Sequence, residues 1–370
     1  MFFSSWLRKP SAKPRTSRRA ASTFRPRVEV LEGRDVPSTF YAATASDLIA
    51  DINAANKAGG TNTIVLTAPT SSPYILTAVN NNADGPTGLP VVSKKDSLTI
   101  VGNGDTIDAN HYARLFDVAG GGSLTLENLT LQNGQAQAAR ATGDSADGGA
   151  IFNQGTLVLS GVTVQFNTAP GWYGGNAAGG GIWSNGSVTL ENSCLVQGNS
   201  AVAGYGGASN AYGGGICIAG GAAYITSTQF GGLFPNKAEG GTNNYNLAGS
   251  AYGGAVCVLA GTVTLSGDIL GGPIGNNGAV NQNVAAAGIA SSNAHGYGYG
   301  GGLCVLGGTV TLTNDVVENN TAGWEDWGGF WEYAHGGGIY IASGATVSID
   351  SFTQTYTFNN TPNGYDINYG

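Results

Sequence analysis

The charged side chains of this chain offer few combinations that could catalyse a reaction. One basic residue beyond the N-terminal region, Arg114, lies close in sequence to several acids, Asp105, Asp108 and Asp117. Cleavage of an acidic polysaccharide by proton abstraction needs a base near acids that bind calcium or substrate carboxylates. These residues do not recur along the chain and fit a generic pattern of short strands. We therefore interpret them as structural.

A second candidate is an aromatic segment near the C-terminus, "GWEDWGGFWEYAHGGG". Its rings and its acids, Glu325, Asp326 and Glu332, could hold a sugar ring, or the segment could pack against the fold as a hydrophobic loop. The acids are weaker candidates for a glycosidase pair, because no spacing specifies the separation of about 5 to 10 Å that such pairs need. The candidate binding residues are Trp324, Trp327, Trp331 and Tyr333, with Trp172 and Tyr173 from an earlier segment.

Histidine and cysteine give no sign of a metal centre. His111, His295 and His335 lack metal-ligand spacing, and no Cys-x-x-Cys occurs, so we expect neither a metal nor another cofactor. Four cysteines in an exported chain would ordinarily suggest disulfides. Stacked parallel side chains suit the disulfide torsion poorly, so we predict reduced, buried thiols that pack as small apolar groups. These are Cys217, Cys257 and Cys304 in one column, and Cys194 in another strand.

Composition indicates an all-β protein. The chain has 62 glycines among 370 residues and only 10% charged residues, but 41% are hydrophobic, so a core can form. Glycine without a three-residue period, together with Thr, Val, Ile and Asn, predicts many short strands joined by tight turns. From Asp35 onward there are six basic and twenty-one acidic residues, which disfavours binding to nucleic acid or to an anionic membrane.

The first 38 residues form a separate basic segment, with nine of the fifteen Lys and Arg residues before Asp35. It lacks the apolar run of a conventional signal peptide. The string from Arg25 to Ser38, "RPRVEVLEGRDVPS", resembles the leader of many exported planctomycete proteins, which implies an extracellular or cell-surface location. The alternative is a disordered basic tail with no sorting role. No stretch approaches the eighteen apolar residues of a transmembrane helix.

The strongest signal is an internal repeat. The motif Gly-Gly-(Gly/Ala)-(Ile/Val/Leu) occurs six times, and each copy is followed by a second short strand and by a third that ends in Asn. Three strands per repeat predict one triangular coil, and stacking places equivalent residues about 4.8 Å apart. The copies begin at Gly148, Gly179, Gly213, Gly253, Gly300 and Gly336.

Columns of equivalent residues predict which side chains face inward. The aliphatic column after the glycines is expected inside: Ile151, Ile182, Ile216, Val256, Leu303 and Ile339. Stacked amides, which also tolerate left-handed backbone, can hydrogen-bond to one another in an asparagine column: Asn167, Asn199, Asn236, Asn277, Asn320 and Asn360.

Other columns are expected to face outward. A threonine ladder suits a β-sheet and comprises Thr156, Thr262, Thr264, Thr309 and Thr311. An apolar column is either covered by long loops or exposed as a groove for a ligand: Phe152, Trp183, Cys217, Cys257, Cys304 and Tyr340. The position before each glycine pair forms a partly aromatic column, which more often reflects packing than recognition: Asp147, Ala178, Tyr212, Tyr252, Tyr299 and His335.

The repeat from Gly148 to Asn360 resembles the polymorphic outer-membrane-protein repeat. That resemblance implies an all-β fold, a right-handed, single-stranded parallel β-helix. The second signature of the family is Phe-x-x-Asn, whereas this chain often has an aliphatic residue in place of Phe, as in "VQGN" and "VENN". The departure weakens the assignment to a family of surface adhesins more than it weakens the fold.

The segment before the repeats predicts a cap. In residues 39–96, "SDLIADINAANKAGG" predicts a short helix capped by Ser46, with Leu48, Ile52 and Ala55 on its buried face. Residues 97–370 form the β-helix. The unequal repeat spacing predicts loops along one edge, as a binding surface or as neutral insertions, at residues 168–178, 200–212, 237–252, 278–299 and 321–335.

These features favour an extracellular or cell-surface module, structural or adhesive, with a binding face lined by loops. A polysaccharide or another surface protein is the expected partner. The alternatives are a carbohydrate-active β-helix enzyme, either a lyase or a glycosidase, and a scaffold without a specific ligand. Acids clustered around Arg114, Lys94 or Lys95 in one cleft would favour the enzyme, whereas a flat aromatic face would favour adhesion.

Overall fold

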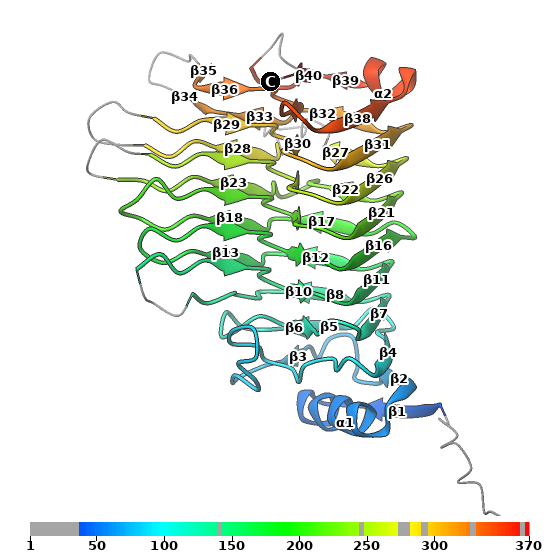
Figure 1. Cartoon of the computed structure of the whole chain (residues 1–370). Helices are drawn as coiled ribbons and strands as arrows, with labels where there is room; N and C mark the ends of the chain where they lie inside the picture. The colour runs from blue at the N-terminus through cyan, green and yellow to red at the C-terminus, as the bar shows by residue number, and fades with distance from the viewer. Residues whose placement is uncertain are drawn as a thin grey trace, which may run out of the picture. The chain divides into compact units, whose positions relative to one another are not determined.

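The structure is a computed structural model that describes residues 37–138, 142–243, 248–272, 282–289, 295–325, 331–362 and 367–369. The chain divides into two compact units, Met1–Arg34 and Asp35–Gly370. The predicted export segment therefore lies almost entirely outside the described residues. The second unit is a parallel β-helix, which confirms the predicted fold class (Figure 1).

Three parallel sheets form the sides of each coil. Sheet 1 contains β1 (Ser38–Ala42), β2 (Gly60–Leu66), β4 (Asp96–Val101), β7 (Ser123–Glu127), β11 (Thr156–Ser160), β16 (Ser187–Glu191), β21 (Ala222–Thr226), β26 (Thr262–Ser266), β31 (Thr309–Thr313) and β38 (Thr346–Ile349). Sheet 2 contains β3 (Tyr74–Ile75), β5 (Thr106–Asp108), β8 (Thr130–Gln132), β12 (Thr163–Gln165), β17 (Leu195–Gln197), β22 (Gln229–Phe230), β27 (Ile269–Gly271), β32 (Val316–Glu318) and β39 (Thr357–Phe358). Sheet 3 contains β6 (Phe116–Val118), β10 (Ile151–Asn153), β15 (Ile182–Ser184), β20 (Ile216–Ile218), β25 (Val256–Val258), β30 (Leu303–Val305), β37 (Ile339–Ile341) and β40 (Ile367–Tyr369).

The hydrophobic core runs along the inside of these three sheets. Strand pairing is in register, so Ile151 lies beside Ile182, and Ile182 beside Ile216. The predicted inward column is completely buried from Ile151 to Ile339. In sheet 1 the alternation of buried and exposed residues also places the predicted threonine ladder outside. The repeat therefore identifies the core correctly.

A helix covers the N-terminal end of the core. Helix α1 (Ala45–Ala58) buries Leu48, Ile52 and Ala55, as predicted. Its N-cap is Thr44 rather than Ser46, because the Thr44 side chain accepts the hydrogen bond from the backbone N–H of Asp47. In sequence the helix connects β1 and β2, the first two strands of sheet 1. In space it lies across the N-terminal end of the stack of coils and shields it (Figure 1).

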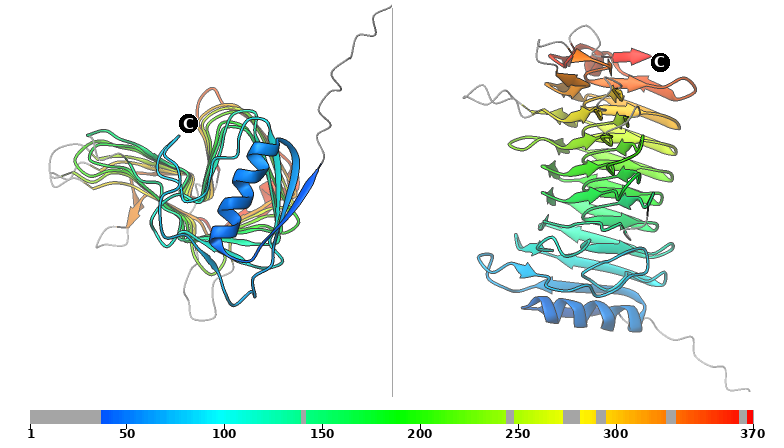
Figure 2. Two further views of the ribbon diagram at one scale, coloured as in Figure 1. Left: turned by 90° about the horizontal axis from the view of Figure 1, so that it is seen from below. Right: turned by 90° about the vertical axis from the view of Figure 1, so that its left-hand side faces the viewer.

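Sheets 4 and 5 replace the predicted row of loops. Viewed along the stack, they form a narrow arm that projects from one side of the coils (Figure 2, left). Sheet 4 contains β13 (Thr168–Pro170), β18 (Ser200–Val202), β23 (Lys237–Glu239), β28 (Val284–Ala286) and β33 (Thr321–Ala322). Sheet 5 contains β9 (Ala146–Asp147), β14 (Ala177–Ala178), β19 (Ala211–Tyr212), β24 (Ala251–Tyr252), β29 (Gly298–Tyr299) and β36 (Ala334–His335).

Alanines hold the two layers of the arm together. Ala201 and Ala238 of sheet 4 and Ala211 and Ala251 of sheet 5 belong to one buried cluster. The sequence did not predict the arm because its strands are only two or three residues long, and because their buried residues are small rather than strongly apolar. The expectation that the extra residues are simple loops is therefore wrong, because strands of sheets 4 and 5 lie within each predicted loop.

The arm explains the glycine pairs. In each copy the first glycine has a positive φ, 66° at Gly213 for example, which favours glycine. The second glycine, Gly214, lies where the two layers meet: a Cβ there would come 2.4 Å from the backbone of both Lys237 and Gly254. Any larger residue would separate the layers. The motif thus marks the turn from the arm back into the coil.

A ladder of buried asparagines lies at the other base of the arm. Each side-chain amide donates to the carboxamide oxygen of the next coil, at 2.9 to 3.0 Å. The fourth member is Asn283, not Asn277, which lies outside the described residues. The copy that starts at Gly253 therefore has a longer interval to its asparagine than predicted. Left-handed backbone occurs at the preceding residue in several coils, such as Phe166, rather than at the ladder residue. The ladder comprises Asn167, Asn199, Asn236, Asn283, Asn320 and Asn360.

The C-terminal end of the β-helix has a short helix, α2 (Ser351–Thr355), between β38 and β39. Strand β40 then pairs with β37. Val347 and Ile349 in β38 are only partly buried, although the equivalent residues of the preceding coils are buried. The end is therefore less well covered than the N-terminal end.

Candidate functional site

The most distinctive surface lies where the arm meets the coil. The turn at each glycine pair brings the outward residues of sheet 3 close to the last residues of the sheet 5 strands. We call these two columns the corner strip. From sheet 3 it contains Asp117, Phe152, Trp183, Cys217, Cys257, Cys304 and Tyr340. From sheet 5 it contains Asp147, Ala178, Tyr212, Tyr252, Tyr299 and His335.

Three cysteine side chains lie side by side in the middle of the strip, in the sheet 3 column. Cys217, Cys257 and Cys304 are completely buried and free, as is Cys194 at 2% exposure, which confirms the predicted burial. Burial raises the pKa of Tyr212 and of Tyr252, and the neighbouring thiols of Cys257 and Cys304 add to the rise. Tyrosines of the second column, rather than long loops, thus pack beside the cysteines.

The tyrosines form a stacked ladder. The ring centroids of Tyr212 and Tyr252 are 5.1 Å apart and nearly parallel, and those of Tyr252 and Tyr299 are 4.8 Å apart. His335 continues the ladder at 5.2 Å from Tyr299. These side chains are half-buried. Because the rings stack face to face, their edges and hydroxyls are the parts that remain for a ligand.

Aromatic rings gather at the C-terminal end of the strip. Tyr297 lies 5.5 Å from both Tyr333 and His335 by ring centroids, and Tyr299 lies 4.7 Å from Tyr340. Tyr297 and Tyr333 are 39% and 37% exposed. The rings of Tyr297 and Tyr333 meet edge to face, with 75° between their planes, whereas Tyr297 stacks on His335 with 26° between the planes.

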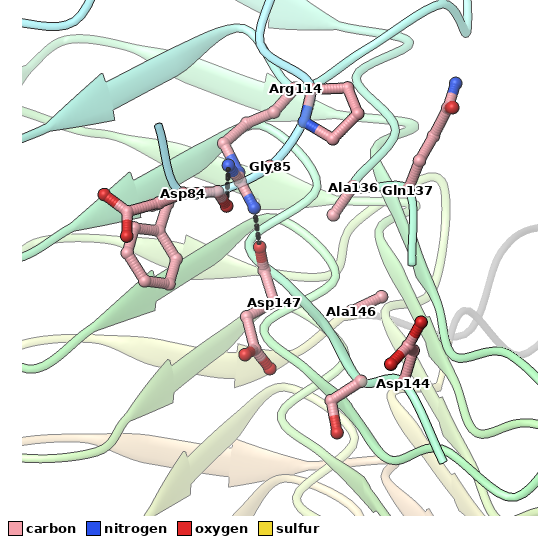
Figure 3. Close-up of a pocket in the computed structure, with 11 residues that line it drawn as sticks. Asp84, Gly85, Arg114, Ala136, Gln137, Asp144, Ala146 and Asp147 are labelled. Carbon is pink, nitrogen blue, oxygen red and sulfur yellow. Dashed lines mark hydrogen bonds between the residues drawn. The ribbon is translucent and has the colours of Figure 1, made fainter. Parts of the chain in front are cut away.

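A pocket of about 290 Å³ lies at the N-terminal end of the strip (Figure 3). Arg114 forms one wall and is 4% exposed. Its guanidinium lies 4.9 Å from the centre of the Phe152 ring. Asp84, Asp144 and Asp147 also line the pocket. The structure thus gathers Asp84, Asp117 and Asp147 around Arg114. Of the three acids that lie near Arg114 in sequence, only Asp117 is among the charges that act on its guanidinium.

The guanidinium of Arg114 donates hydrogen bonds mainly to backbone carbonyls. Its Nε donates to the carbonyl of Gly148 at 2.9 Å, and its Nη2 to that of Asp147 at 2.7 Å. Its Nη1 donates to the carbonyl of Asp84 at 3.0 Å and to Oγ1 of Thr87 at 3.3 Å. With its donors engaged in this way, Arg114 holds together two backbone segments, at Asp84 and at Asp147–Gly148, and is poorly placed to act as a base.

Two carboxyl groups near the pocket are easily protonated. Burial raises the pKa of Asp147 to about 6, and the positive charge of Arg114 offsets part of that rise. Burial and the charge of Asp84 raise the pKa of Asp117 to about 6 as well. Carboxyl groups that titrate near neutral pH can donate or accept protons in catalysis. No cluster with the composition of a metal site occurs among the residues that the structure describes.

The predicted aromatic candidates do not form one site. Trp324 and Trp331 lie in an antiparallel pair, β34 (Trp324–Glu325) and β35 (Trp331–Glu332), and Trp327 is outside the described residues. Tyr333 joins the rings at the C-terminal end of the strip. Trp172 and Tyr173 lie in the turn between β13 and β14, are 45% and 48% exposed, and so belong to a separate surface.

Sequence reasoning found the two columns of the strip but not the pocket. Asp84 and Asp147 are 30 and 33 residues from Arg114 and meet it only after the chain completes further coils. The column position of Asp147, directly before a glycine pair, was the available signal.

Comparisons with models of protein families, with curated proteins and with solved structures found no match. Within the described part of the chain, no helix has the length and apolar character needed to cross a membrane.

Proposed function

We propose that this chain is an extracellular or cell-surface β-helix module that binds a polysaccharide along the corner strip. The observation that carries the proposal is a row of half-buried aromatic and polar side chains on one face, interrupted only by the buried Ala178. From Asp147 to His335 the row spans six coils, about 24 Å at the spacing of paired strands.

The repetition of the strip suits a repeating ligand. A chain molecule laid along the strip would meet similar groups at every coil, and several weak contacts on one chain add up to useful affinity. Tyrosine hydroxyls can hydrogen-bond to sugar hydroxyls, and the exposed parts of the Tyr297 and Tyr333 rings offer apolar surface. Export, supported by the resemblance of the segment from Arg25 to Ser38, would give the module access to such polymers.

Glycan-array binding followed by titration with the best polymer tests this proposal. We expect Trp183→Ala and Tyr297→Ala each to weaken binding at least tenfold. Tyr224→Ala is the matched control, because Tyr224 is 53% exposed but lies on sheet 1, away from the strip. Equal loss in the control, or no glycan binding by the folded wild type, would refute the assignment.

A carbohydrate-active enzyme is a second candidate, favoured by the raised pKa values of Asp117 and Asp147 beside the pocket. A turnover assay on neutral and uronate polymers separates the two functions. Activity that Asp147→Asn abolishes would establish the enzyme, whereas binding without turnover leaves the module non-catalytic.

A further inference from the structure

The outer surface of sheet 1 carries a regular array of hydroxyl groups. We call it the threonine face, and it consists of the outward residues at two equivalent positions of the nine strands from β2 to β38. Fifteen of the eighteen positions are Thr or Ser. The first column is Thr61, Ser97, Ser123, Thr156, Ser187, Ala222, Thr262, Thr309 and Thr346. The second is Thr63, Thr99, Thr125, Val158, Thr189, Tyr224, Thr264, Thr311 and Ser348.

The array is nearly a flat lattice. Every strand pair from β2 to β38 is parallel and in register, so each column continues without a shift. Successive coils also overlie one another when viewed along the stack (Figure 2, left). The rows are therefore about 4.8 Å apart, and the two columns, two residues apart along a strand, are about 6.7 Å apart.

The hydroxyl groups are available for a ligand. All the residues of the face are partly or fully exposed. Among the described residues, no hydroxyl of the two columns has a hydrogen-bond partner in the protein; the nearest outward hydroxyls that do, Thr226 and Ser160, lie in a third column. The donors and acceptors of these hydroxyl groups are therefore free to hydrogen-bond with water or with a ligand.

The β-propensity of threonine does not by itself explain the face. Propensity accounts for threonine in strands, but it does not exclude charge from an exposed sheet. The third outward column of the same sheet contains Glu127 and Glu191, and the outer side of sheet 4 carries Lys237 and Glu239. The eighteen positions of the threonine face contain no charged residue.

The spacing of the lattice matches hydrogen-bonded water. In a tetrahedral network, two successive O–H···O bonds of about 2.75 Å span about 4.5 Å. The rows of the threonine face are therefore about 0.3 Å wider than the second-neighbour spacing of such a network. Rotation of exposed side chains can absorb this difference over a few coils. Hydroxyl groups at these positions can take the places of water molecules in an ordered layer.

We propose that the threonine face binds ice. An uncharged, nearly flat hydroxyl lattice fits a surface of ordered water, whereas a polysaccharide would gain little from a face that has a single aromatic ring. That ring, Tyr224, is 53% exposed and interrupts the lattice. The five strands β2, β4, β7, β11 and β16 form a block on its N-terminal side in which only Val158 lacks a hydroxyl, and a three-strand block lies beyond it.

Ice affinity of the full chain tests the proposal. We expect the purified protein to shape ice crystals, to lower the freezing point relative to the melting point, and to be incorporated into a growing ice hemisphere. The double variant Thr99→Lys with Thr125→Lys places two charges in the centre of the larger block. We expect it to reduce the freezing-point gap at least tenfold.

The matched control is Thr130→Lys with Thr163→Lys, in neighbouring coils on the outer side of sheet 2. It should retain the activity, while Tyr224→Thr, which repairs the lattice, should increase it. Circular dichroism melts check that each variant is folded. Absence of ice activity in the folded wild type overturns the proposal, as does equal loss in the control. Binding of the face to crystalline cellulose without ice activity overturns the assignment of the ligand.

Discussion

The side-chain amide of Asn199 donates a hydrogen bond to Oδ1 of Asn236 at 3.0 Å, and the backbone N–H of Asn199 donates to the same oxygen at 3.2 Å. Asn236 in turn donates to Oδ1 of Asn283 and to the carbonyl of Val196. One carboxamide thus satisfies backbone and side-chain groups of three successive coils. All of these asparagines are completely buried.

We predict that Asn236→Ala lowers the free energy of unfolding by about 3 kcal/mol or more, because several buried polar groups lose their partners at once. Urea unfolding measures the change. Asn53→Ala on the exposed side of α1 is the control and should cost less than about 0.5 kcal/mol. Equal effects for the two variants would contradict a structural role for the ladder.

The second glycine of the motif gives a steric prediction. Gly214→Ala would place a Cβ 2.4 Å from backbone atoms of Lys237 in sheet 4 and of Gly254 in the turn of the next coil, so we expect a loss of about 3 kcal/mol or more in unfolding free energy. Gly220→Ala is the matched control, since its Cβ would come no closer than 3.7 Å to other atoms. If both variants melt at the wild-type temperature, the layers do not meet as described.

Two buried carboxyl groups predict a pH-dependent stability. Asp268 accepts hydrogen bonds from the backbone N–H groups of Thr228 and Ser266, and Asp315 accepts one from the N–H of Asp268. Burial raises the pKa of Asp268 to about 7 and that of Asp315 to about 6. Because the folded state holds these protons more tightly than the unfolded state, stability is greatest at low pH. It should fall as the pH rises from about 4 to about 7.

Thermal melts across this range test the effect. Asp268→Asn should flatten the decline, which amounts to at most about 4 kcal/mol for this group at about 1.4 kcal/mol per pKa unit. Asp350→Asn should act in the opposite sense, because hydrogen bonds with Thr353 lower the pKa of Asp350. A wild-type melting temperature that rises steadily with pH would show that these buried carboxyl groups do not dominate the pH dependence of stability.

The thiols give a prediction about reactivity. A hydrogen bond with Cys257, together with burial, raises the pKa of Cys217 well above its ordinary value, and burial does the same for Cys257. Thiolate, the reactive form, is therefore scarce in the folded state. Thiol titration without reductant should show almost no reaction in the native protein and four thiols after denaturation. Two or fewer thiols in denaturant would mean that disulfides form.

Much of the coil was predictable from the sequence because a parallel β-helix repeats one local rule. Each coil places equivalent residues side by side, so the uniform aliphatic column from Ile151 to Ile339 identifies the inside without knowledge of distant contacts. The same rule identified most of the asparagine ladder. It failed at Asn277, because an insertion before Asn283 changes the count of residues but leaves the hydrogen bonds of the buried amide unchanged.

Only the tertiary structure decided how the parts outside the repeat meet. The cap of α1 falls at Thr44 because the geometry of the first turn selects the oxygen that reaches Asp47. Arg114 meets the carbonyls of Asp84 and Asp147 because separate coils converge at the corner. The arm forms because small residues let two backbones approach closely, a gain that no hydrophobic pattern reveals. The sequence by itself thus determined the periodic core, whereas contacts between different coils and layers depend on how the chain closes each turn in space.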